Sequence, residues 1–450
     1  MNPMTRQLLF TKRKHPVYGA SWNKAASPVL TRTDAAVGMT AAAGVGAGLV
    51  RNDFDGAEIY REIHDVTDTL GNVFRRIPKT YIRKTDGVGL WAPQISKTWY
   101  PGYYLPWCFW NFVTSQELPY VDVGKHKGSG ELIGGTERLR SVPNVYPLIN
   151  QTIVTFRTRA QNNNTGGLLG YQQLDIHVVD LLQTLFYIEF ATLHSQSIMA
   201  GYTTGQSTAT HTATVAETGV NRIIVANAHA DLFRVGQAIS VGTTLGGNEI
   251  FYGRTITTID VYDASNKAIS FDGAAVNIAV GNILYNIGWR NGFSSAIAAS
   301  SGSLVSNSDG KYPCSYCGIE SPWSDVSQLV DGVNINERQA WVAPNAADYA
   351  SNVFASPYLQ LGYVNGATDG YVTAMGYDAN YPYAAFPTAV GGSDATFYSD
   401  YYASAAGQMV ARVGGSQGSG TLGGLSTWGL SSASSAAAMT IGGRLVKKPL

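Results

Sequence analysis

The clearest helical pattern in the chain runs from about Gln172 to Ser195. The apolar positions that recur there at helical spacing are Leu174, Val178, Leu181, Leu182, Leu185, Ile188 and Phe190. Apolar residues nearly encircle this helix, which is typical of a helix with no face in solvent. We therefore expect a helix in the core, surrounded by sheet or loops.

The pattern changes after Gly201. From Thr203 to Tyr285 the chain alternates short β-branched stretches with Gly or Asn turns, as in NRIIVAN, QAISVG and KAISFDG. Several short strands at this spacing indicate a small β-barrel or β-sandwich. We expect residues 202–286 to form an all-β domain inserted into a larger domain.

Length and composition favour a folded, loop-rich protein of several domains. A chain of 450 residues is too long for one compact core. Charged residues make up 14% and apolar residues 45%, a composition that can bury a large core. Fifty Gly and 26 Tyr with so few charges favour a β-containing surface protein over a helical enzyme.

Charges are balanced overall but unevenly placed. Lys+Arg and Asp+Glu each total 31, which excludes binding of nucleic acid or an anionic membrane by net charge. Residues 1–33 contain basic side chains and no acid, whereas residues 339–411 contain five Asp and no Lys or Arg. We expect residues 1–48 to form an extended arm packed on a partner, or alternatively a solvated tail.

No targeting or membrane segment is expected. Residues 1–14 lack an apolar run followed by a small-residue cleavage site. The most hydrophobic stretch, residues 174–193, contains too many charged and polar side chains for a spanning helix.

The motifs that could carry catalysis or bind metal lack their required partners. Cys314 and Cys317 have the spacing of half a zinc site, but the chain's one other cysteine is Cys108. Residues 414–418 (GGSQG) match a nucleophile elbow with no His after them, and residues 418–423 (GSGTLG) lack the acid of a dinucleotide site. The spacing of Asp325 and Asp331 does not favour a glycosidase pair. We expect no enzyme activity, cofactor or metal.

Tyrosines concentrate between Tyr358 and Tyr402, where nine of the 26 fall among Gly, Asn, Ser, Thr and Asp. Tyr gives large amphipathic contact area at low entropic cost, and Ser, Gly and Asn give adaptable hydrogen bonds. The predicted binding residues are Tyr371, Tyr377, Asp378, Tyr381, Tyr383, Asp394, Tyr398, Tyr401 and Tyr402. The alternative is that half of these rings pack the loops themselves, because long loops need an internal core.

Several segments resemble one known family. Residues 318–335 (GIESPWSDVSQLVDGVNI) resemble its G-[IV]-E-N-x-W-G-N-[IV]-W-x-x-x-D-G segment. Residues 410–416 (VARVGGS), 423–425 (GGL), 431–435 (SSASS) and 441–445 (IGGRL) resemble its closing strands. Residues 74–82 resemble the opening strand, and residues 143–190, with a helix start at Gln172–Asp175, resemble the first helix.

The family is the C-type-lectin-like domain of the formylglycine-generating-enzyme group, in the version found in bacteriophage tail-fibre and receptor-binding proteins. The resemblance implies an α+β fold: a lectin-like domain of residues 49–201 and 287–450 with long loops, the inserted domain, and the extended arm. Because no cysteine follows Cys317, the oxidase activity of the family is not carried over.

The resemblance further implies a homotrimer on the virion surface, made in the host cytoplasm, whose loops bind a host cell-surface glycan or protein. The arm, through Arg6, Lys12, Arg13 and Lys14, would attach to other phage structural proteins. The alternative is a purely structural virion component, such as a head fibre, collar or decoration protein.

Overall fold

The computed structural model describes residues 15–450 apart from 168 and 206. Strands account for 40% of the chain and helices for 12%, and the largest sheet is curled into a half-barrel. The described helices are α2 (Ile153–Gln161), α3 (Ile176–Phe190) and α4 (Asn227–Ala230). The expected α+β class is therefore wrong, because the described chain is largely all-β and has one long helix. None of its helices is both long and apolar enough to cross a membrane.

Helix α3 lies at the centre of the main body, and every residue in it except Gln183 is buried. The prediction of a core helix is confirmed, but its ends differ. The Asp175 side chain caps the helix by accepting a hydrogen bond from the Val178 N–H at 3.0 Å. The helix ends where Ala191 adopts the left-handed conformation, with φ of 51°.

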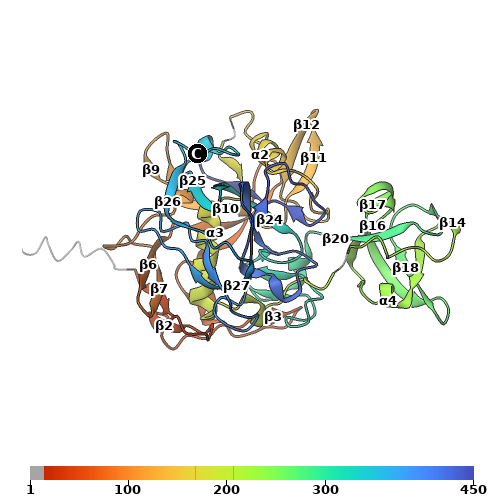
Figure 1. Cartoon of the computed structure of the whole chain (residues 1–450), viewed down its shortest axis with the longest axis horizontal. Helices are drawn as coiled ribbons and strands as arrows, with labels where there is room; N and C mark the ends of the chain where they lie inside the picture. The colour runs from red at the N-terminus through yellow and green to blue at the C-terminus, as the bar shows by residue number, and fades with distance from the viewer. Residues whose placement is uncertain (1–14, 168, 206) are drawn as a thin grey trace, which may run out of the picture.

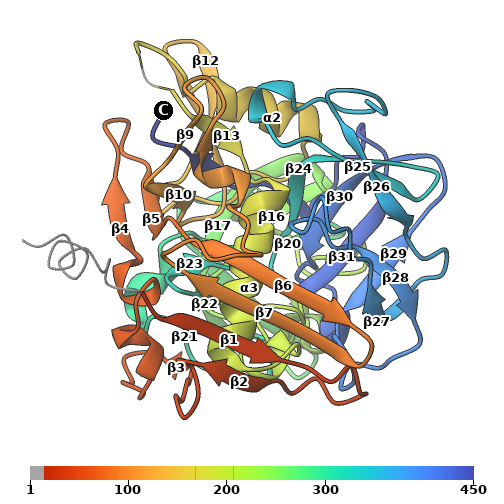
Figure 2. The same cartoon turned by 90° about the vertical axis from the view of Figure 1, so that its left-hand side faces the viewer.

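An antiparallel sheet covers one side of α3 (Figure 2). Its order is β2 (Thr31–Asp34), β1 (Val17–Ser21), β7 (Leu90–Ser96) and β6 (Tyr81–Gly87). Strands β1 and β7 contact the helix directly.

The N-terminal segment belongs to this body rather than to an extended arm. Trp22 and Leu30 are core residues, and β3 (Gly44–Val45) pairs with β21 (Gly302–Ser303). The expectation of an arm is therefore wrong for residues 15–48, because β1 and β2 are strands of a sheet that packs on α3. Arg6, Lys12, Arg13 and Lys14 lie outside the described residues.

The curled sheet covers the other side of α3, which it contacts through β24. Its order is β26 (Leu359–Val364), β25 (Gln339–Val342), β24 (Ser327–Asn336), β30 (Gln408–Gly414), β31 (Gly424–Ser432), β29 (Tyr401–Ser404), β27 (Gly370–Met375) and β28 (Pro387–Val390), with β32 (Ile441–Gly442) beside β24. The core helix is thus enclosed between two sheets.

Smaller sheets complete the body. One has the order β13 (Tyr171–Gln173), β33 (Leu445–Lys447), β10 (Tyr120–Gly124), β5 (Val73–Pro78) and β4 (His64–Thr67). The others are β23 (Ile319–Glu320) and β22 (Cys314–Tyr316) beside β21 and β3, and the hairpins β8 (Trp110–Asn111) with β9 (Gln116–Glu117) and β11 (Ser129–Ile133) with β12 (Thr136–Arg140).

A lobe projects from the body on the side away from β6 and β7 (Figure 1). Its strands are β15 (Arg222–Ala226), β18 (Asn266–Phe271), β17 (Gly247–Val261), β16 (Gln237–Thr244) and β20 (Ile283–Trp289), with β14 (Glu217–Val220) paired to β19 (Val276–Ile278). The lobe has its own core, which includes Ile239, Phe251 and Ile269. It lies in the segment where the sequence indicates short strands.

Buried ion pairs connect the segment 318–335 to other parts of the body. Arg157 of α2 donates two hydrogen bonds to the Asp331 carboxylate, at 2.7 and 2.8 Å. Lys127 forms an ion pair with Asp325, and both side chains are almost completely buried. Each of the two carboxylates, Asp325 and Asp331, thus has a cationic partner inside the body.

Candidate functional site: an aromatic cavity

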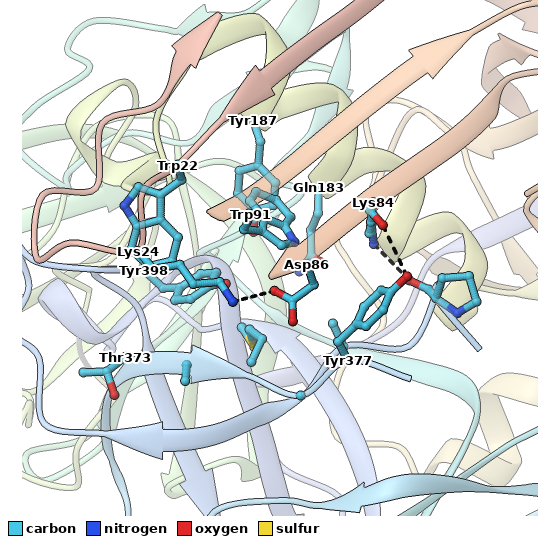
Figure 3. A pocket seen from close by; sticks show the side chains of 15 residues that line it. Trp22, Lys24, Lys84, Asp86, Trp91, Gln183, Tyr187, Thr373, Tyr377 and Tyr398 are labelled. Atoms are coloured by element: carbon cyan, nitrogen blue, oxygen red, sulfur yellow. Dashed lines mark hydrogen bonds and ion pairs between the residues drawn. The ribbon is translucent and has the colours of Figure 1, made fainter. Parts of the chain in front are cut away.

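A cavity opens between the β1–β7–β6 sheet and the segment that runs from β27 to β28 (Figure 3). Its empty space, including the mouth, is about 680 Å³. We call this space the aromatic cavity, because rings form much of its lining.

Five rings line the aromatic cavity: Trp22, Trp91, Tyr187, Tyr377 and Tyr398. Trp22 lies edge-to-face on Tyr398, with ring centroids 5.4 Å apart, and Trp91 lies edge-to-face on Tyr187 at 5.6 Å. Such tilted pairs are favoured by the ring quadrupoles and fix the rings in place.

The backbone brings the two tryptophans together. The Trp22 N–H donates to the Trp91 carbonyl at 2.8 Å, and the Trp91 N–H donates back to Trp22 at 2.9 Å. The Trp22 indole N–H donates to the Ser27 carbonyl at 2.7 Å. The walls of the cavity are therefore rigid before any ligand arrives.

Polar groups stand at the mouth and beneath the wall of the cavity. Lys24 Nζ lies 2.6 Å from Asp86 Oδ1, and both side chains remain partly accessible. Lys84 forms a buried ion pair with Asp180 of α3 and donates to the Pro382 carbonyl at 3.3 Å. The mouth thus offers one cation and one carboxylate that neutralise each other.

Tyr377 is the lining ring most open to solvent, with 38% of its surface exposed. Its hydroxyl donates to the Lys84 carbonyl at 3.2 Å. Burial, together with the carboxylates of Asp86 and Asp378, raises the pKa of Tyr377. The Tyr377 hydroxyl therefore stays protonated at neutral pH, and its ring forms part of the cavity wall.

Three of the predicted binding tyrosines are core residues: Tyr383, Tyr398 and Tyr402. Tyr383 packs on His177 with ring centroids 4.3 Å apart, and burial lowers the pKa of that histidine to about 4, so its ring is neutral. The Tyr402 hydroxyl donates to the Gly366 carbonyl at 2.8 Å. These three rings belong to the internal core, which is the alternative that the sequence left open, and Tyr398 also lines the aromatic cavity.

The other predicted binding residues are more accessible but do not gather at one point. Tyr371 and Tyr401 form an edge-to-face pair at 5.7 Å, and Tyr381 leans on Tyr383. Asp378 accepts hydrogen bonds from the N–H groups of Gly362 and Asn380, at 2.7 and 2.9 Å, so its carboxylate fixes a turn. Asp394 is exposed. Of the nine predicted residues, the structure brings Tyr377 and Tyr398 together in the aromatic cavity.

The sequence analysis missed the half of the cavity that comes from the N-terminal segment and the core helix. The residues missed are Trp22, Lys24, Asp86, Trp91 and Tyr187. One available signal was the DGVG turn at residues 86–89 followed by Trp91, which is typical of a hairpin with an aromatic residue near its end.

The cysteines are buried and free. Burial raises the pKa of Cys314 to about 12, so its thiol stays protonated at neutral pH. Within the described part of the chain, no group of three or more His, Cys, Asp or Glu side chains could hold a metal ion.

Comparison with known proteins adds no assignment: no family model matches the chain, and no curated protein is similar to it. Function is therefore argued from the chemistry of the aromatic cavity.

Proposed function

We propose that the protein is a bacteriophage virion-surface adhesin that binds a host cell-surface glycan in the aromatic cavity. The observation that carries the binding part is a cavity lined by five rings with an accessible ion pair at its mouth. The virion part rests on the resemblance of residues 318–335 and 410–445 to phage receptor-binding proteins.

A sugar ring fits the chemistry of this cavity. A pyranose has apolar C–H faces that pack against flat aromatic rings, and a rim of hydroxyls that needs a few well-placed polar groups. Tyr377 and Trp91 offer ring surface, while Lys24 and Asp86 offer a donor and an acceptor. Since these two charges neutralise each other, the site favours an uncharged sugar over a strongly anionic one.

The cavity supports binding rather than hydrolysis. Glycosidases of the common type need two carboxyl groups on either side of the scissile bond. Asp86 is the one carboxylate among the residues that line the aromatic cavity, and it is paired with Lys24. Beneath the wall, Asp180 is buried against Lys84 and accepts from the Tyr104 hydroxyl at 2.7 Å, and the Asp378 carboxylate accepts two backbone N–H bonds.

Replacing Tyr377 by alanine should weaken glycan binding about tenfold or more, which corresponds to roughly 1.4 kcal/mol. The ring is partly exposed, so its loss removes contact area from the ligand and little from the core. The measurement is binding of the purified protein to a microarray of bacterial O-antigen and capsular polysaccharides, followed by titration of the best binder.

The matched control is Tyr262→Ala. Tyr262 is 41% exposed and directly follows β17 in the projecting lobe, away from the cavity. We expect this variant to bind like the wild type. If Tyr377→Ala also binds like the wild type, the aromatic cavity is not the binding site. If the parent phage carrying Tyr377→Ala assembles and adsorbs to its host normally, a purely structural virion role describes the protein better.

A further inference from the structure

A second cavity lies on the other side of the segment that contains Tyr377. Its empty space is about 760 Å³, and its lining includes Trp99, Trp107, Trp110, Glu117 and Asn380. Two of the chain's nine tryptophans line the aromatic cavity and three line this second cavity, so five of the nine serve the two spaces. Such a concentration of large rings beside two neighbouring openings indicates a shared role.

The two cavities are physically joined by one wall. Pro382 lines both, and its carbonyl accepts a hydrogen bond from Lys84 of the aromatic cavity. Tyr104 of the second cavity donates to Asp180, which forms the ion pair with Lys84. These contacts hold the segment between the two cavities in one position, so the distance between the cavities is fixed.

The segment 377–382 separates the two cavities, and its outer surface is open to solvent. Tyr377, Ala379 and Asn380 are exposed, and Pro382 is partly exposed. A flexible linear ligand can therefore pass over the segment 377–382 from one cavity to the other without displacing it.

The second cavity repeats the chemistry of the first. Trp99 is 55% exposed, and its indole N–H donates to the Tyr103 carbonyl at 2.9 Å, which fixes the ring. Glu117 is paired with Lys79 at 2.7 Å and remains accessible, as Asp86 does with Lys24. Each cavity thus combines one exposed ring, Tyr377 or Trp99, with less accessible rings and one carboxylate that is paired with a lysine.

We infer that the two cavities are subsites of one site for a linear oligosaccharide, which runs over the segment 377–382 with sugar rings packed in each cavity. The inference rests on the proposed function and extends it from a single sugar to a chain. It predicts that affinity rises with the length of the glycan until both cavities are filled, because the second cavity adds contacts that a short fragment cannot reach.

The test titrates size-graded fragments, from monosaccharide to octasaccharide, of the polysaccharide that binds best on the microarray. We expect Trp99→Ala to weaken binding of the long fragments about tenfold and to leave the shortest fragments unchanged. Tyr377→Ala should weaken binding at every length. Asn380→Ala, a second exposed change in the second cavity, should follow Trp99→Ala more weakly, and Val113→Ala, at an exposed position outside both cavities, should have no effect.

The test distinguishes failure of this inference from failure of the proposed function. If Tyr377→Ala weakens binding while Trp99→Ala and Asn380→Ala change no fragment, the second cavity is not a subsite and the proposed function stands. If Trp99→Ala changes the oligomeric state rather than the affinity, the second cavity is a subunit contact and the inference is overturned. If the wild type binds no polysaccharide, the proposed function and this inference both fail.

Discussion

Replacing Asp331 by alanine should lower the free energy of unfolding by about 3–5 kcal/mol, the usual cost of breaking a buried ion pair by removing one partner. Asp331 is 2% exposed and accepts two hydrogen bonds from the Arg157 guanidinium. Its loss leaves that charge buried without a counterion, and also removes an acceptor from the Gly332 N–H at 3.0 Å. The measurement is the midpoint of urea unfolding.

Helix α2 supplies a matched control. Arg159 lies on the same helix as Arg157, but it pairs at 3.4 Å with Glu137, whose side chain is 48% exposed. Glu137→Ala should cost no more than about 1 kcal/mol, because solvent screens an exposed pair. The double variant Arg157→Met/Asp331→Leu should cost less than Asp331→Ala alone, since it leaves no unpaired charge. Equal destabilisation by Asp331→Ala and Glu137→Ala would contradict a structural role for the buried pair.

Replacing Glu189 by glutamine should stabilise the protein at pH 8 by about 3 kcal/mol and have little effect at pH 5. Glu189 is 1% exposed, and burial raises its pKa to about 7. Its carboxylate accepts from the Asn52 amide at 2.7 Å and lies 3.9 Å from the Cys317 thiol, both neutral groups. The Arg32 guanidinium, which donates to the Glu189 backbone carbonyl, lowers this pKa by less than burial raises it.

The direction in which the unfolding free energy changes with pH follows from the proton bound to Glu189. Between the ordinary glutamate pKa of 4.5 and about 7, the folded protein keeps a proton on Glu189 that the unfolded chain has released. Stability from this group is therefore lost as the pH rises through that window and stays low above it. Glutamine resembles the protonated form at every pH, so the difference in unfolding free energy between variant and wild type should grow from pH 5 to pH 8.

The measurement is urea unfolding of both proteins at several pH values, with Glu137→Gln as an exposed control that should keep the wild-type dependence. Taking the difference between two proteins removes the contributions of the histidines they share. A constant difference across pH 5 to 8 would show that Glu189 does not titrate in this window.

The core helix could be predicted because its signal is local, whereas its exact start could not. Gln172 and Gln173 fit the helical pattern, but in the structure they pair as β13 with β33, at the other end of the chain. A long-range strand pairing thus overrides the local preference, and the helix begins after the Asp175 cap, at Ile176, four residues later than predicted.

The all-β character of the body was missed for a related reason. Strand β24 is buried on both faces along almost its whole length, so its residues do not alternate between apolar and polar. Strands β1 and β7 are short and join segments far apart in the chain. Neither feature leaves the period-two pattern by which a strand is identified from sequence.

The candidate site was half predicted. The density of tyrosines points to Tyr377, which lines the aromatic cavity, but density does not tell which way a ring points. Tyr401 and Tyr402 are neighbours in β29, where successive side chains face opposite sides, so one of the two had to be internal. Trp22 and Trp91 meet through backbone hydrogen bonds between distant segments, and no local pattern reports such a pairing.

The most direct test of the account is hydroxyl-radical footprinting of the protein with and without the polysaccharide that it binds best. Our account predicts protection of Tyr377, Trp91 and Trp99, with Tyr252 and Tyr262 of the lobe labelled equally in both samples. Protection of the lobe tyrosines, with Tyr377 and Trp99 labelled as in the free protein, would place recognition elsewhere and contradict it.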